Sequence, residues 1–219
     1  MGPTLKNVSG CTLMIVALIS LIFSPLADFT SFTYCHENTR GPYEMQCIQL
    51  DAQAKGDVKF KRRQAETVNV PIQLSQPVRD KFIALLAATN YLDHPETFES
   101  GKKIADLGPK RLTIEMPGGN REATFNYSLR KDVTDLSTFF EGLINQETLG
   151  FDIQNAMQFE KLSIPKRLEQ MENELRANRI SDPDRLIPML EKIEADQQIV
   201  NYARLQAGKI KRRIQTAGK

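Results

Sequence analysis

Residues 67–74 read TVNVPIQL, and apolar side chains occupy every second position of this stretch. The apolar positions are Val68, Val70, Ile72 and Leu74. An alternation of this kind predicts a β-strand with one buried face and one exposed face. Pro71 falls on the polar face and has no N–H group to donate, so we expect the strand to lie at an edge of its sheet.

The hydrophobic period changes directly after this strand, in the sequence SQPVRDKFIALLAA at residues 75–88. Ser75, Gln76 and Pro77 resemble a helix start, with proline near the first helical position. The apolar positions that then recur at helical spacing are Val78, Phe82, Leu85 and Leu86. We therefore expect an amphipathic helix that packs on the sheet, which favours an α+β fold.

Further strands and a second helix are predicted on both sides of this unit. Residues 43–47 and 58–60 each alternate, and residues 112–116 and 123–127 alternate on either side of the turn sequence PGGN. The second amphipathic stripe comprises Val133, Leu136, Phe139, Phe140, Leu143 and Ile144. The sequence therefore predicts a small antiparallel sheet with two amphipathic helices, an α+β domain over residues 43–146.

Residues 147–219 are predicted to be an all-helical C-terminal region. The apolar stripes comprise Ile164, Leu168, Met171 and Leu175, then Leu186, Ile187, Leu190 and Ile193, and finally Ile199, Ala203, Ala207, Ile210 and Ile214. Asp182 belongs to a predicted N-cap of the second helix, and Pro188 should kink that helix. These apolar faces must be buried against each other or against the sheet domain.

Residues 182–214 resemble a single HEAT-type helical hairpin, through Asp182-Pro183, the proline of Leu186-Ile187-Pro188, and Val200, Ala203, Gly208 and Ile210. The pattern departs from that family at Asn201 and Arg204. The resemblance implies a helical scaffold that binds other proteins. The order of elements over residues 57–146 also looks like that of small exported bacterial domains of unassigned function, and it implies no site residues.

The N-terminus carries the clearest signal for location. Residues 11–27 are almost wholly apolar, and their length lies between a signal-peptide core and a membrane-spanning helix. Both a membrane anchor and a cleaved signal peptide remain open. Residues 1–10 should form a short cytoplasmic flank and residues 28–42 a juxtamembrane segment. In either case the body lies outside the cytoplasm, anchored by a single apolar helix or secreted after cleavage.

Two cysteines follow the apolar run. Cys35 and Cys47 form an even pair in an oxidising compartment, so we predict a disulfide between them. Its short loop would contribute about 3 kcal/mol to the free energy of unfolding. One alternative is two unpaired thiols, because the sequence does not show that the Cβ atoms approach. The other is a metal site in which both cysteines and His36 are ligands, with His94 or an aspartate as the fourth.

No motif of a known catalytic centre occurs in the sequence. There are only two histidines, and the patterns of a nucleophile elbow, a P-loop and a dinucleotide-binding loop do not occur. We therefore expect a protein that is not an enzyme and uses no cofactor. The alternative is a hydrolase or metal-dependent enzyme with dispersed site residues, around His36, Asp93, His94 and Asp106.

Charge indicates the class of partner. The 29 basic residues nearly balance the 27 acidic ones, so the overall charge does not point to nucleic acid. Basic residues gather at the C-terminus, where Asp196 is the last acid. We expect a protein-interaction or structural module that contacts the membrane through its N-terminal helix. The predicted partner-binding residues are Tyr202, Arg204, Lys209 and Arg213.

Overall fold

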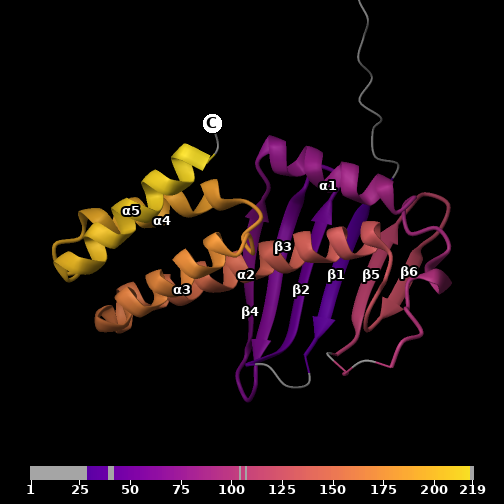
Figure 1. Cartoon of the computed structure of the whole chain (residues 1–219), viewed down its shortest axis with the longest axis horizontal. Helices are drawn as coiled ribbons and strands as arrows, with labels where there is room; N and C mark the ends of the chain where they lie inside the picture. Colours follow the sequence, from indigo (N-terminus) through magenta and orange to yellow (C-terminus); the bar gives the residue numbers. More distant parts are fainter. Residues whose placement is uncertain (1–28, 39–41, 104, 107, 218–219) are drawn as a thin grey trace, which may run out of the picture.

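The computed structural model describes residues 29–38, 42–103, 105–106 and 108–217, and in these ranges the chain has an α+β fold (Figure 1). The strands are β1 (Ser31–Glu37), β2 (Tyr43–Asp51), β3 (Lys55–Arg62), β4 (Thr67–Gln73), β5 (Lys110–Glu115) and β6 (Arg121–Phe125). The α-helices are α1 (Gln76–Ala88), α2 (Lys131–Phe159), α3 (Ile164–Arg176), α4 (Ile187–Ala195) and α5 (Asn201–Ala217). The predicted fold class is therefore confirmed for the described part of the chain.

The strands form one antiparallel sheet in the order β4-β3-β2-β1-β5-β6. Strand β4 lies at an edge, which confirms the position expected from Pro71. Strand β1 was not predicted, because residues 28–42 were assigned to a juxtamembrane segment. It nevertheless lies inside the sheet, between β2 and β5. Its sequence SFTYCHE carries only two inward apolar side chains, Phe32 and Tyr34, which is a weak periodic signal.

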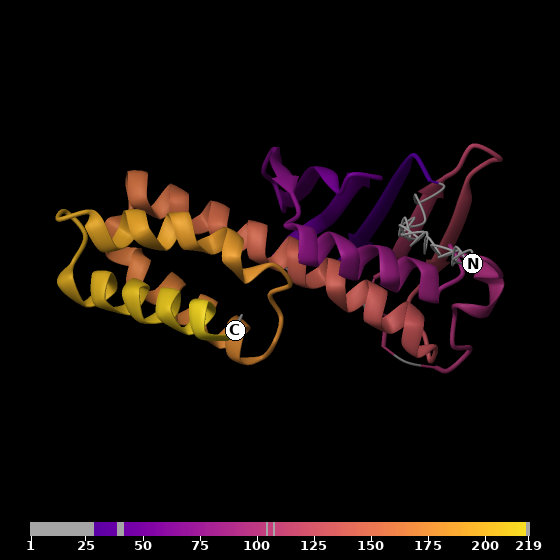
Figure 2. The ribbon, with the colours of Figure 1, turned by 90° about the horizontal axis from the view of Figure 1, so that it is seen from above.

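Helices α1 and α2 cover one face of the sheet, as Figure 2 shows from above. Aromatic side chains fill the space between the layers. The rings of Phe32 and Phe140 stack with 4.8 Å between their centroids, and Phe82 meets Phe140 edge to face at 5.5 Å. The opposite face of the sheet carries alternating polar residues, so this two-layer domain buries apolar area on one side only.

Helix α2 joins the sheet to the helical bundle. It runs for 29 residues and is continuous across Gln146, where the sequence analysis placed the end of the α+β domain. The hydrophobic cluster under the sheet includes α2 up to Ile144, and the cluster of the bundle begins at Leu149. One rigid element therefore carries both cores, and α3, α4 and α5 extend from its second half beyond the β4 edge (Figure 1).

A buried carboxylate ties the loop before α4 to the sheet domain. Asp182 is 1% exposed, and it accepts hydrogen bonds from the backbone N–H and the hydroxyl of Ser75, both at 3.2 Å. Its own N–H donates to Gln146 Oε1 at 2.9 Å. Asp182 stands at the N-cap position of the 3₁₀ turn Pro183–Leu186, as predicted, but its side chain binds the start of α1 and makes no capping hydrogen bond.

The beginning of α4 also differs from the prediction. A 3₁₀ turn spans Pro183–Leu186, and α4 begins only at Ile187. Pro188 therefore lies in the first turn of α4, where its missing N–H has no intrahelical partner to lose. The expected kink inside a longer helix is replaced by this junction between a 3₁₀ turn and an α-helix.

The predicted disulfide between Cys35 and Cys47 is present. The two residues are direct partners in the β1–β2 ladder, with 4.1 Å between their Cα atoms. The bridge lies on the sheet face that α1 and α2 do not cover, since Phe32 and Tyr34 alternate with Cys35 and point to the helices. It therefore joins two interior strands of the sheet and does not tether a separate segment.

The N-terminal predictions concern residues outside the described ranges. These are the cytoplasmic flank 1–10 and the apolar run 11–27, with Cys11 inside it. Among the residues that the structure describes, no helix combines the length and the apolar character needed to cross a bilayer.

We predict that replacing Asp182 by alanine lowers the free energy of unfolding by about 1–3 kcal/mol, because the partly buried N–H and hydroxyl of Ser75 lose their acceptor. Urea unfolding followed by circular dichroism measures the change. Asp184→Ala, at an exposed position in the same turn, is the matched control and should change stability by less than about 0.5 kcal/mol. Equal effects of the two variants would contradict the role of Asp182.

We also predict that the disulfide contributes about 3 kcal/mol to the free energy of unfolding, since it closes a loop with a sequence separation of 12. The comparison is between the oxidised protein, the reduced protein and a Cys35→Ala/Cys47→Ala variant, all carrying Cys11→Ala so that no other thiol reacts. The reduced protein and the double variant should unfold at the same lower urea concentration. A midpoint that reductant leaves unchanged would show that the bridge adds no stability.

Candidate functional site

A polar cleft of about 280 Å³ lies where α2 passes over β1 and β2, with α3 along its rim. Helix α2 contributes a stripe of polar side chains at intervals of four, three and four residues, which places them on one face. This stripe comprises Glu141, Asn145, Thr148 and Asp152. The facing wall comes from the strands and comprises Tyr34, His36, Tyr43 and Gln46. The cleft therefore combines side chains that are distant in the sequence.

One end of the cleft is built around Glu141. The buried phenol of Tyr34 donates a hydrogen bond to Glu141 Oε1 at 2.9 Å, and Lys110 Nζ lies 2.6 Å from the same oxygen. Burial raises the pKa of the Tyr34 phenol well above its ordinary range, and the negative charge of Glu141 raises it further. Tyr34 therefore acts as a fixed hydrogen-bond donor at neutral pH.

The other end is built around Asp152. Its carboxylate accepts a short hydrogen bond from Arg62, and Arg167 Nη1 lies 3.2 Å from its second oxygen. Arg62 also donates to the hydroxyl of Tyr43 at 3.0 Å and lies over the Tyr43 ring. Burial is the main cause that raises the pKa of Tyr43. Both carboxylates of the cleft are thus matched by cations.

Amide side chains occupy the space between these ends. The side-chain nitrogen of Asn145 donates to Glu174 Oε2 at 3.0 Å and to the Arg179 carbonyl oxygen at 3.1 Å, so its oxygen is left as an acceptor. Gln46 and Gln170 line the cleft, and within the described residues no hydrogen bond engages either side-chain amide. The cleft therefore offers neutral donors and acceptors between a lysine–glutamate pair and a carboxylate that two arginines share.

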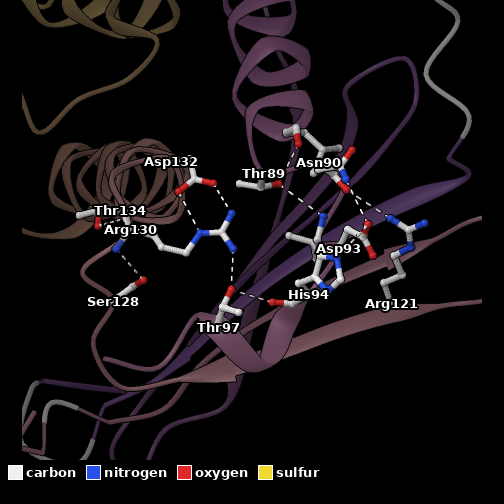
Figure 3. Close-up of polar contacts among 12 residues, drawn as sticks. Thr89, Asn90, Asp93, His94, Thr97, Arg121, Ser128, Arg130, Asp132 and Thr134 are labelled. Carbon is white, nitrogen blue, oxygen red and sulfur yellow. Dashed lines mark hydrogen bonds and ion pairs between the residues drawn. The ribbon is translucent and has the colours of Figure 1, made fainter. Parts of the chain in front are cut away.

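The residues of the enzyme alternative are placed in different parts of the fold. Of the four, only His36 lines the cleft. Asp93 and His94 lie in the loop after α1 (Figure 3). His94 is exposed, and its Nδ1 is 3.3 Å from Glu96 Oε1. Asp106 accepts the backbone N–H of Gly108 at 2.9 Å. Within the described residues, no group of three or more potential ligands could hold a metal ion.

The loop after α1 contains backbone strain that the sequence did not reveal. Asn90, Tyr91 and Leu92 all have positive φ angles, of 50°, 52° and 58°, which is costly for residues with a Cβ atom. Arg121 of β6 donates from Nη1 to the carbonyl oxygens of Asn90 and Tyr91, at 3.2 and 3.0 Å (Figure 3). These bonds hold the left-handed turn against the sheet.

A second arginine fixes the end of this loop to α2. Arg130 Nη1 donates to the Thr97 hydroxyl at 2.7 Å, and its Nη2 donates to Asp132 at 2.5 Å (Figure 3). The hydrogen bond from Arg130 holds the pKa of Asp132 below its usual value. Arg130, Thr97 and Asp132 bind one another through these hydrogen bonds, so we assign the three residues a structural role.

The predicted partner-binding residues lie on α5, the outermost helix of the bundle (Figure 1). At 100° per residue, Tyr202, Lys209 and Arg213 fall on one exposed strip, and Arg204 falls on the far side of the helix. Arg204 donates to Gln197 Oε1 at 2.9 Å, whereas Lys209 lies 3.5 Å from Glu172 Oε1. Leu205, 65% exposed, belongs to the same strip and was not singled out from the sequence.

The high pKa of Tyr34 predicts how stability changes in alkali. An unfolded tyrosine ionises near pH 10, whereas Tyr34 in the fold stays protonated, so its contribution is complete below pH 10 and is lost as pH rises further. Tyr34→Phe should lower the free energy of unfolding by about 0.5–1.5 kcal/mol at pH 8, and this deficit should shrink above pH 10. Urea unfolding at pH 8–11 measures it.

The control for this experiment is Tyr127→Phe, because Tyr127 is exposed. It should follow the pH dependence of the unmodified protein. A deficit of Tyr34→Phe that stays constant from pH 8 to pH 11 would contradict the assigned protonation of Tyr34.

Comparison with known proteins supplies no relative from which a function could be transferred. No family model matches the chain, and no curated protein is significantly similar to it. Any function must therefore be inferred from the contacts, burial and charge of this chain's own residues.

Proposed function

We propose that this chain is a non-enzymatic protein-interaction module that works outside the cytoplasm, held at the membrane or exported by its apolar run at residues 11–27. The proposed contact surface is the strip of Tyr202, Leu205, Lys209 and Arg213 on α5. The apolar run supports the location, and the strip supports the interaction.

The observation that carries this proposal is the exposure of two large apolar side chains between cations. Tyr202 is 68% exposed and Leu205 is 65% exposed, although the opposite side of α5 is buried in the bundle. Tyrosine and arginine are enriched among residues that contribute most to binding energy at protein interfaces. A strip with both types suits a partner that offers an apolar groove.

The charge of α5 indicates which charged groups the partner carries around its apolar groove. The helix carries five basic residues and no acidic residue between Asn201 and Ala217. Lys211 is paired with Glu194 at 2.6 Å, and Lys209 has a longer contact with Glu172. Arg213 is exposed on the strip. The partner should therefore present carboxylates around an apolar centre, because such charge complementarity speeds association and excludes basic surfaces.

The alternative of a hydrolase or metal-dependent enzyme remains a prediction from the sequence. No specific contact among His36, Asp93, His94 and Asp106 favours it over the interaction module. None of these four residues lies on α5, so variants of the α5 strip test the interaction module without testing the enzyme alternative.

The proposal predicts a site-specific cross-link. Benzoylphenylalanine placed at Leu205 in the full chain should, on irradiation of intact native membranes, give one adduct of discrete mass. Lys209→Gln with Arg213→Gln should lower the adduct yield at least severalfold, and 0.5 M salt should do the same because it screens exposed charges.

Lys192 on α4 is the matched control, because it is also an exposed position of the bundle. The same photo-reactive residue at Lys192 should give no adduct of that mass. Equal adducts from both positions, or a yield at Leu205 that neither salt nor the double variant changes, would argue against α5 as the contact surface.

A further inference from the structure

We infer that the polar cleft between α2 and the strands β1 and β2 binds a small molecule rich in hydroxyl groups, of the size of one or two sugar rings. This inference is independent of the proposed function, because the cleft shares no residue with the strip on α5.

The charges at the ends of the cleft exclude cationic ligands. A cation would need a carboxylate that is not already matched, but Glu141 pairs with Lys110, and Asp152 pairs with both Arg62 and Arg167. A cationic ligand would therefore have to displace an existing partner of one carboxylate in a partly enclosed space. Because two arginines share the single charge of Asp152, that end of the cleft carries one positive charge in excess, and a ligand with a carboxylate is not excluded.

The remaining hydrogen-bonding groups suit hydroxyls. Gln46 and Gln170 each offer a donor and an acceptor, and Asn145 offers its oxygen. A hydroxyl group both donates and accepts, so it can satisfy a neighbouring pair of such groups in one contact. Because these amides come from β2, α2 and α3, they approach a ligand from different sides.

The volume and the lining of the cleft limit the size and the kind of ligand that fits. The volume of about 280 Å³ lies just below the usual range for small-molecule sites, which is roughly 300–1,000 Å³. The buried side chains of Ile144 and Leu149 line the same space, so the cleft also presents apolar surface to the carbon skeleton of a ligand. A sugar ring has this combination of an apolar face and a rim of hydroxyls.

The groups that hold the cleft open are rigid. Tyr34 is fully buried, stacks near Phe140 and is fixed by its hydrogen bond to Glu141. Asn145 is held by two acceptors from α3 and the loop that follows it. A site with pre-positioned side chains loses less conformational entropy on binding.

The test is saturation-transfer NMR on the full chain in a detergent without a sugar headgroup, with glucose, N-acetylglucosamine and maltose as probes. At least one probe should receive saturation and bind with a dissociation constant below about 1 mM. Spermidine, as a cationic probe, should not compete with it. Failure of all three sugars to bind, or displacement by spermidine, would overturn the inference.

Substitutions of residues that line the cleft test whether the sugar binds there. Gln170→Ala and Gln46→Ala should each weaken binding about tenfold, which corresponds to about 1.4 kcal/mol. Gln170 is exposed on α3, so its replacement should not disturb folding even if that of Gln46 in the sheet does. Gln158→Ala, also exposed but outside the cleft, is the control and should bind normally. Binding that survives Gln170→Ala unchanged would place the sugar elsewhere and reject the site.

Discussion

The placement of the helical bundle against the sheet depends on one buried carboxylate. Asp182 enters a space closed by the start of α1 and by α2, and both supply its hydrogen bonds through Ser75 and Gln146. A buried carboxylate without such partners would cost several kcal/mol, so the loop has few alternative positions. Gly142 allows this approach, because a Cβ atom there would lie 2.3 Å from Ser181 Oγ. The same contact therefore holds the loop between α3 and α4 against the start of α1 and against α2.

The fold was predictable from the sequence where hydrophobic periodicity was strong. Strand β4, helix α1 and the hairpin of β5 and β6 all follow patterns of period 2 or 3.6. Strand β1 lacks a comparable pattern, and one of its two neighbours in the sheet, β5, comes from a distant segment that no local signal specifies. The position of Asp182 before a proline indicated an N-cap, but the partner of its side chain, Ser75, lies 107 residues away.

The candidate cleft was less predictable than the fold. The sequence singled out His36 and the cysteine pair, but it missed Tyr34, Glu141 and Asp152, because each looks like an ordinary residue of a strand or helix. The spacing of Glu141 and Asp152, three helical turns apart with polar residues between them, was the available signal. It identifies a polar face of α2, but it cannot show that the strands leave that face uncovered. Tertiary packing alone creates the cleft.

The strand order has a consequence for how the chain folds. Strands β1 to β4 are consecutive neighbours and can pair as they are synthesised, and the cysteines of β1 and β2 come together within the first of these hairpins. The other side of β1 pairs only with β5, about 80 residues later in the chain. Pairing across such a separation is slow, because the entropy of closing the intervening loop must be overcome first. Until β5 arrives, β1 is an open edge, and this interval is when the growing chain is most exposed to aggregation.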